Sequence, residues 1–258
     1  MKTSSKLLWA LLCLIVISIF SMATIARIDL KEIQKVNGNG IVSSKRISMD
    51  HFNGFTLTGD IRARYVPDST FAIVIRTDSN LHRYVSHKIY SYNWAEIGLD
   101  RAFGEATQLD LEIHAPTLQG MNAYNSAEIY FDSLLEQHRL QVSVRNSSHI
   151  ELFVNTDELR LNSHNSSSIK IKGQTEDLEL EVNNSSQIDA SDLIADFANV
   201  EANGSGKAKV HVRQRLMSHA NAGGSVVYQG PESLTVKASG RGTTLPAQGN
   251  QSSDEALP

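Results

Sequence analysis

Apolar and polar residues alternate along most of the second half of the chain, and a short polar triplet interrupts the alternation at regular intervals. Apolar side chains at every second position are typical of a β-strand with one buried face, whereas a helix requires apolar spacings of three and four. The Asn, Ser and Gly residues of the triplets favour turns, because they tolerate left-handed backbone. Successive triplets are about 19 residues apart and begin at Asn125, Asn146, Asn165, Asn184, Gly204, Ala222 and Gly240.

A strand–turn–strand unit of this length is too short to enclose a hydrophobic core, so neighbouring units must stack. Stacked parallel strands lie ~4.8 Å apart, and equivalent side chains then form ladders. The pattern therefore predicts an all-β, single-stranded parallel β-helix with coils of about 19 residues, strongest over residues 118–245. The Gly-rich later triplets predict tighter turns. We expect an internal aliphatic ladder of Ile129, Ile150, Ile169 and Ile188. We expect an amide ladder at the turns, made of Asn125, Asn146, Asn165 and Asn184.

The first half of the chain also has strand patterns, although without a fixed period. One helical turn is expected within residues 80–86, and the β-helix as a whole is expected to span residues 36–245. Gly and Pro residues separate the alternating or apolar runs, as they do between strands. These runs occupy residues 55–65, 71–76, 89–99 and 109–114.

The chain begins with a segment that is typical of export. Two lysines precede an apolar run from Leu7 to Phe20, and small residues follow up to Ala26. This order predicts that residues 1–26 are a secretory signal peptide. A retained membrane anchor is the alternative, because the stretch from Leu7 to Ala26 is about one bilayer span. Residues 27–35 are then expected to be a linker.

Composition narrows the classes of protein that remain. The net charge of -4, from 24 Lys+Arg and 28 Asp+Glu, argues against a nucleic-acid footprint. The only cysteine, Cys13, lies in the N-terminal apolar run, so a disulfide framework and a Cys-rich zinc site are excluded. Such a chain suits an oxidising compartment, and we expect it in the periplasm, at the cell surface or secreted, or anchored in the inner membrane. Residues 246–258 have no apolar face and are expected to be a disordered tail.

Several segments match a known family. They are the opening Asn-Gly-Asn-Gly-Ile-Val at residues 37–42, Phe-Thr-Leu-Thr-Gly-Asp-Ile at 55–61, the run 109–116, and the repeated small-residue turns. Over roughly residues 36–245 the chain resembles the auto-transporter adhesin head GIN domain, a bacterial domain family of unknown function. The resemblance implies a right-handed parallel β-helix in envelope or secreted proteins, and it implies no catalytic residue and no particular partner. Turns of that family usually read Ser-Gly-Ser-Gly-Asp, whereas the earlier turns here read Asn-Ser-Ser.

An enzyme on this scaffold would need carboxylates clustered on one face. Asp189, Asp192 and Asp196 lie within one coil and have no matching acid in a neighbouring coil, so we interpret them as a solvated loop rather than a sugar or calcium site. His149 and His164 flank adjacent turns, but a metal site would need a third ligand. We therefore predict no catalytic residue, metal or cofactor. The column three residues after each triplet start mixes polar types: Glu128, His149, Ser168, Gln187, Lys207, Ser225 and Thr243.

Aromatic residues concentrate in residues 84–103, the least repetitive part of the expected β-helix. We favour the interpretation that they cap an end or side of the solenoid. A stacking platform for sugars or a partner is the alternative. Together with two histidines they define a candidate binding surface: Tyr84, Tyr90, Tyr92, Trp94, Phe103, His149 and His164.

These observations predict an exported, non-catalytic protein of the cell envelope that presents a surface for adhesion or binding. Its partner would be a glycan or an envelope protein rather than a nucleic acid, and an uncleaved N-terminal segment would be its only contact with a membrane. A polysaccharide-active enzyme is an alternative by analogy of fold alone. A structural component of the envelope is the other alternative.

Overall fold

The computed structural model describes residue 18, residues 35–106 and residues 108–247. The predicted leader (residues 1–26, apart from Ser18), the linker before Lys35 and the expected tail after Ala247 lie outside these residues. No helix in the described part of the chain is long and apolar enough to cross a membrane. A short 3-10 helix, η1 (His82–Tyr84), lies where one helical turn is expected.

The described residues form one continuous sheet of 17 strands that winds into a solenoid. The strands of the first half are β1 (Val42–Ser48), β2 (Gly54–Thr58), β3 (Arg62–Pro67), β4 (Ala72–Asp78), β5 (Val85–Tyr90), β6 (Trp94–Leu99) and β7 (Leu109–Ala115). Those of the second half are β8 (Gly120–Tyr124), β9 (Glu128–Phe131), β10 (Leu135–Arg145), β11 (His149–His164), β12 (Ser168–Asn183), β13 (Gln187–Asn203), β14 (Lys207–Asn221), β15 (Ser225–Gln229), β16 (Ser233–Ser239) and β17 (Thr243–Pro246).

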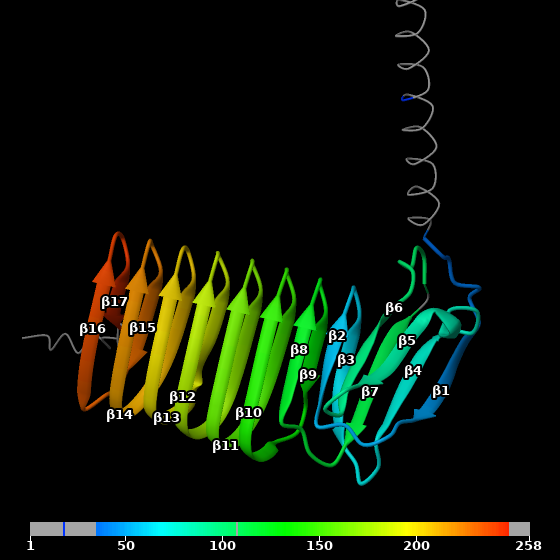
Figure 1. The fold of residues 1–258 in the computed structure, drawn as a ribbon, viewed down its shortest axis with the longest axis horizontal. Coiled ribbons are helices and arrows are strands. Elements are labelled where there is room, and N and C mark those ends of the chain that lie inside the picture. The colour runs from blue at the N-terminus through cyan, green and yellow to red at the C-terminus, as the bar shows by residue number, and fades with distance from the viewer. Residues whose placement is uncertain (1–17, 19–34, 107, 248–258) are drawn as a thin grey trace, which may run out of the picture.

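Each of the strands β11 to β14 begins after one triplet and ends before the next, so its two halves lie on opposite sides of the solenoid. We name the side formed by the second halves sheet A; it also contains the second half of β10 and the strands β6, β2, β8 and β16. The side formed by the first halves is sheet B; it also contains β7, β3, β9, β15 and β17. In Figure 1 the chain runs upward on the near side, turns at the top and returns behind while the coils advance to the left. The winding is therefore right-handed, and the parallel β-solenoid is confirmed.

Equivalent isoleucines lie next to one another inside the solenoid. Parallel pairing places Ile150 between Ile129 and Ile169, and the register continues from Ile169 to Ile188. All four side chains are buried, so the expected aliphatic ladder is confirmed. Burial of one such side chain contributes about 1.5–3 kcal/mol, which is why the coils stack rather than separate.

The asparagines of the triplets form the expected amide ladder along the turn edge. Asn146 Nδ2 donates to Asn125 Oδ1 at 2.9 Å, and Asn165 Nδ2 donates to Asn146 Oδ1 at 3.0 Å. Asn184 Nδ2 donates to Asn165 Oδ1 at 3.3 Å. The Asn and the Ser that follows it have φ angles between 51° and 71° in every Asn-Ser triplet. Asn is among the few residues that visit this left-handed region readily.

The turns become tighter from Asn184 onward, one triplet before the Gly-rich turns for which composition predicts it. At Asn146 the backbone bonds between coils: Ser147 N–H donates to Asn165 O at 3.1 Å. From Asn184 onward a bond closes within the turn, with Ser186 N–H donating to Asn183 O at 3.2 Å and Gly206 N–H donating to Asn203 O at 3.0 Å. A Cβ on Gly206 would clash with the backbone carbonyl of Val182 in the coil below. The chain therefore packs backbone against backbone at this column in the later coils.

The first half of the chain departs from successive winding. The β2–β3 coil lies between the β6–β7 coil and the β8–β9 coil, so neighbours in sequence are not neighbours in space. The strands β1, β4 and β5 pair antiparallel and close this end of the solenoid (Figure 1). Successive parallel stacking therefore holds from β8 onward and not in the first half. The reason is that a segment without a fixed period does not specify which coil covers which.

Candidate binding face on sheet A

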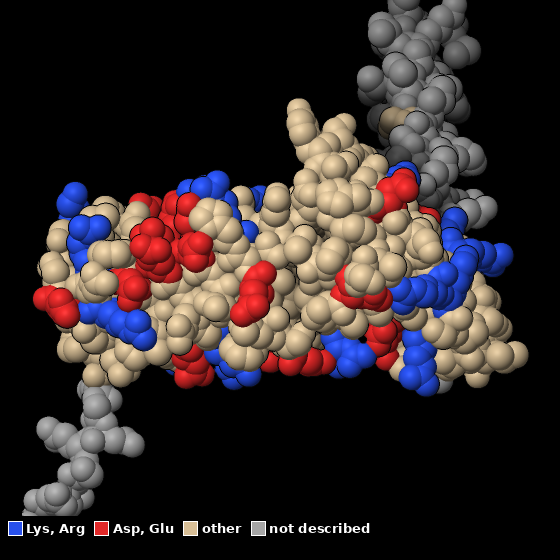
Figure 2. Space-filling view, turned by 90° about the horizontal axis from the view of Figure 1, so that it is seen from below, with Lys and Arg blue, Asp and Glu red and all other residues tan. Residues whose placement is uncertain are grey.

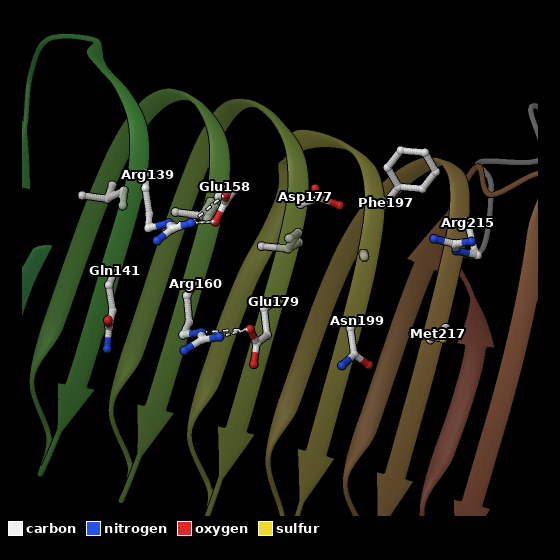
Figure 3. A pocket seen from close by; sticks show the side chains of 14 residues that line it. Arg139, Gln141, Glu158, Arg160, Asp177, Glu179, Phe197, Asn199, Arg215 and Met217 are labelled. Atoms are coloured by element: carbon white, nitrogen blue, oxygen red, sulfur yellow. Dashed lines mark hydrogen bonds and ion pairs between the residues drawn. The ribbon is translucent and has the colours of Figure 1, made fainter. Parts of the chain in front are cut away.

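The outward positions of sheet A line a shallow groove of about 510 Å³ that runs across the strands β10 to β14. The groove is built from two rows of side chains, because outward residues of neighbouring coils stand side by side in a parallel sheet. Figure 3 shows both rows projecting from the same face. The first row is Arg139, Glu158, Asp177, Phe197 and Arg215. The second row is Gln141, Arg160, Glu179, Asn199 and Met217.

Two ion pairs bridge adjacent coils in these rows (Figure 3). The Arg139 guanidinium donates to both carboxylate oxygens of Glu158, at 2.7 Å from Nε and 2.9 Å from Nη2. This bond to Arg139 lowers the pKa of Glu158 below its ordinary value and raises the pKa of Arg139. Arg160 Nε donates to Glu179 at 2.8 Å in the second row. Both pairs are exposed, so they order the surface and contribute little to stability.

The far end of the groove is partly apolar. The Arg215 guanidinium lies 5.1 Å from the centroid of the Phe197 ring, and Met217 is 40% exposed beside them. The Oδ1 atom of Asn199 is buried and has no hydrogen-bond partner among the described residues. The lining residues include three arginines and three acidic residues, so the formal charge of the groove is balanced. Charged, amide, aromatic and thioether groups thus meet on one surface that has no net formal charge.

Trp94 lies beside the opposite end of the groove, on the same face of sheet A. A Cβ on Gly120 would come within 2.9 Å of the indole Cη2 atom, and one on Gly54 would clash with the ring. These two glycines therefore leave space for the ring to lie against the sheet. The indole Nε1–H donates to Thr56 Oγ1 at 2.8 Å, which fixes the orientation of the ring.

The structure separates the aromatic residues that the sequence groups together. Tyr90 and Trp94 are cross-strand partners in the β5–β6 hairpin and share one face. Tyr92 is at the tip of that hairpin and is 94% exposed. Tyr84 belongs to η1, where Arg83 stacks on its ring, and Phe103 packs against the core near Val36. Only Tyr90, Tyr92 and Trp94 are therefore close together; Tyr84 and Phe103 belong to the closed end.

The two candidate histidines contact different partners. His149 is on the outer face of sheet B, where its Nδ1 lies 2.7 Å from Ser168 Oγ. His164 ends the sheet A half of β11, and its Nδ1 lies 3.2 Å from the Asn183 amide nitrogen. The structure does not bring the pair together. Among the described residues no group of three or more His, Cys, Asp or Glu side chains is placed to hold a metal ion.

Two of the three acidic residues proposed from the sequence as a solvated loop, Asp189 and Asp196, form ion pairs on sheet B and its edge, and no ion pair involves Asp192 among the described residues. Asp189 lies 3.1 Å from Lys209 Nζ, and Asp196 lies 3.4 Å from Arg213 Nη1. The acids of the groove, Glu158, Asp177 and Glu179, are not among the residues that the sequence indicates. They stand seven or five residues before their triplets, so a comparison of every column of the repeat is the signal that points to them. Viewed from the edge opposite the triplet turns, acidic and basic groups are mixed along the solenoid (Figure 2).

A second hollow, of about 940 Å³, lies on the outer side of sheet B near the closed end. Three arginines line it, and two of them are paired within the sheet. Arg62 Nη2 lies 2.8 Å from Glu128, and Arg64 contacts Glu112. Sheet A is the stronger candidate because its groove adjoins an exposed aromatic surface.

The fold and this face define a parallel β-solenoid with a polar groove across its strands. A family profile described as "Putative auto-transporter adhesin, head GIN domain" matches residues 51–231, which is more than half of the chain. The protein belongs to this family. No curated protein matches the sequence.

Solved structures share the architecture. A "putative adhesin" from Parabacteroides merdae is 25% identical with a TM-score of 0.71, covering 83% of this chain and 99% of that one. A "putative adhesin" from Bacteroides fragilis is 15% identical with a TM-score of 0.74, covering 82% and 100%. A "putative lipid binding protein" from Parabacteroides distasonis is 16% identical with a TM-score of 0.65, covering 83% and 100%. The last two show a shared fold only.

Proposed function

We propose that this protein is an exported, non-catalytic binding protein of the cell envelope that attaches to its partner through the outer face of sheet A. The observation that carries the proposal is the groove itself, where ten outward side chains from five coils form two ordered rows. Membership of an adhesin-like family and the similarity to the Parabacteroides merdae protein also support a binding role.

The chemistry of the groove suits binding of a large, polar partner. Ion pairs between Arg139 and Glu158, and between Arg160 and Glu179, hold the side chains in fixed positions before a partner arrives. Preorganised side chains lose little conformational entropy on binding, which raises affinity for a given contact area. The parallel backbone pairing of β10 to β14 keeps the spacing of the rows constant.

A binding panel of glycans, extracellular matrix proteins and envelope fractions tests this function. We expect the full chain to bind at least one member well above background. Arg160→Glu reverses a charge in the groove and should weaken that binding. Lys170→Glu makes the same charge change on the sheet B half of the neighbouring strand β12, and it should leave that binding unchanged. No binding to any member, or equal effects of both variants, would contradict the proposal.

Export is supported by the leader-like composition of residues 1–26 and by the absence of any cysteine except Cys13. We expect the protein in the periplasmic, surface or secreted fraction of cells. The mass of the mature protein separates a cleaved signal from a retained anchor. Recovery in the cytoplasmic fraction would contradict the proposal.

A polysaccharide-cleaving enzyme is the second candidate, because Glu158, Asp177 and Glu179 lie on adjacent coils in one groove. A lowered pKa keeps Glu158 ionised at neutral pH, so it does not suit a general acid. Asp177 has no ion-pair partner among the described residues. Release of reducing ends from a polysaccharide, abolished by Asp177→Asn, would favour the enzyme. No release after prolonged incubation would favour the binding protein.

A further inference from the structure

One row of outward positions on sheet A runs without interruption from the β5–β6 hairpin into the groove. Tyr90 pairs with Trp94, Trp94 with Gly54, and Gly54 with Gly120. Gly120 pairs with Gln141, the first member of the second row of the groove. The Trp94 ring fills the two glycine positions, so the aromatic surface and the groove are contiguous.

The aromatic end of this row is built as a flat surface. One face of the Trp94 ring lies against the sheet over the two glycines, and the residue is partly exposed to solvent. The bond to Thr56 fixes the ring, and Thr56 also accepts a hydrogen bond from Asn122 at 3.0 Å. Tyr90, the cross-strand neighbour of Trp94, is 52% exposed. A ring held in this way offers an apolar face beside polar groups, which is the surface on which the C–H face of a sugar ring packs.

We infer that this row binds a linear, neutral polysaccharide whose sugar rings lie along the solenoid axis, with Trp94 stacking on one ring and the groove binding the hydroxyls of those that follow. The inference rests on the proposed function and names the class of ligand. Neighbouring positions of the row are ~4.8 Å apart, which is comparable to the length of one sugar residue in an extended chain. The amide of Gln141, the Arg160–Glu179 pair and the Nδ2 group of Asn199 supply hydrogen-bonding groups in succession along it.

The charge of the groove selects a neutral ligand over a charged one. Three arginines are balanced by three acidic residues. An anionic polymer would meet the carboxylates at close range, and a cationic polymer would meet the guanidinium groups. Hydroxyl groups can donate to the carboxylates and accept from the guanidinium groups without either penalty.

Affinity electrophoresis of the full chain tests the inference, with hydroxyethyl cellulose, galactomannan and dextran as neutral probes and polygalacturonate as the anionic comparison. We expect at least one neutral probe to retard the protein and polygalacturonate not to do so. Trp94→Ala should weaken binding about tenfold, as expected for a central aromatic contact. Trp94→Phe should retain most of the affinity. Phe153→Ala removes an aromatic side chain from the outer face of sheet B and should change nothing.

Gln141→Ala serves as a second variant, because this exposed side chain leaves the fold intact when truncated. We expect a loss of a few fold in affinity, and far-ultraviolet circular dichroism identical to that of the wild type. Unchanged binding by both Trp94→Ala and Gln141→Ala overturns the inference, as does retardation by polygalacturonate alone. If the wild type binds a matrix or envelope protein but no neutral polysaccharide, the inference fails and the proposed function stands. If it binds nothing, both fail.

Discussion

At the scale of single residues, the alternation of the pleat decides which side chains enter the core. Ile169 is buried between the isoleucines of the neighbouring coils, and the next residue, Lys170, is exposed on the outside of sheet B. A shift of one residue would exchange these two environments. The chemistry of each position is therefore fixed by its distance from the triplet.

The inward register predicts unequal effects of two substitutions in the same coil region. Ile169→Asp buries an unpaired charge and should cost about 3 kcal/mol or more in the free energy of unfolding. His164→Ala removes only a partly exposed side chain and should have little effect. Urea unfolding followed by far-ultraviolet circular dichroism measures both. Ile169→Val, expected to cost about 1 kcal/mol, is the matched control for loss of packing alone. Equal tolerance of Asp and Val at position 169 would show that the ladder is not inside.

The buried hydroxyl of Tyr65 should make the folded protein less stable at high pH. Its hydroxyl donates to Ala115 O at 2.8 Å inside the core, and burial raises the pKa of Tyr65 to about 12. In the unfolded chain a tyrosine pKa is ~10. Since the folded pKa is the higher one, the contribution of neutral Tyr65 is fully present below about pH 10 and declines as the pH rises toward about 12.

Urea unfolding at several pH values between about 8 and 12 checks this expectation. Tyr65→Phe should lower stability at about pH 8 by roughly 1 kcal/mol, through the lost hydrogen bond, and should reduce the loss at high pH. Tyr92→Phe, at the exposed hairpin tip, should leave the pH profile of the wild type unchanged. If the wild type, Tyr65→Phe and Tyr92→Phe lose the same stability at high pH, Tyr65 is not the source of that loss.

At the scale of elements, the Asn-Ser turns and the later, Gly-containing turns link adjacent coils through side chains at different positions. The Asn-Ser-Ser turns hold adjacent coils together through side-chain amides and bonds between backbones. The later, Gly-containing turns have no amide ladder at the first triplet position; instead Asn221 Nδ2 donates to Asn203 Oδ1, one residue earlier in each coil. The ladder is thus displaced by one position rather than lost.

Two substitutions at Asn165 separate the contribution of its left-handed backbone conformation from that of its side-chain hydrogen bonds. Asn165→Gly keeps the left-handed conformation, where φ is 58°, but removes hydrogen bonds to Asn146 and Asn184. Asn165→Ala removes the same bonds and also forces a Cβ-bearing residue without a local polar group into that region, at about 1–2 kcal/mol. We expect the Ala variant to be the less stable of the two in chemical unfolding. A more stable Ala variant would show that backbone conformation at this turn is unimportant.

At the scale of the whole molecule, each coil is stabilised mainly by the coils on either side. The central strands β11 to β13 have neighbours on both sides, whereas β16 and β17 form the last described coil. Leu234 and Val236 in that coil are 40% and 45% exposed, although the residues at the equivalent positions of the coil before it, Leu216 and Ser218, are fully buried. Stability in such an array is approximately a sum over neighbouring contacts.

Hydrogen exchange should therefore vary along the solenoid. We expect the slowest exchange in β11 to β13 and the fastest in β16 and β17, because local opening at an end breaks contacts with one neighbour only. Mass spectrometry of peptic fragments after deuterium labelling measures this gradient. Uniform protection from β8 to β17 would indicate that the last coil is covered or that the array opens as one unit.

Much of the architecture and only part of the candidate site were predictable. The triplet spacing predicts the isoleucine and amide ladders, since a constant period brings equivalent residues together. Trp94 and Tyr90 were identified as candidates from their clustering, but Tyr84 and Phe103 turn out to lie elsewhere. The groove acids do not follow from the column after the triplet, because they stand in the columns five and seven residues before it.

The repeat is enough to specify the coil, its turns and its inward register, because a repeat of constant length repeats the same local physics. Tertiary packing sets the place of the β2–β3 coil between two later coils, and with it the position of the Trp94 ring over Gly54 and Gly120. Those contacts join residues far apart in a part of the chain that has no period. Their selection depends on the fit of whole surfaces, which no local pattern encodes.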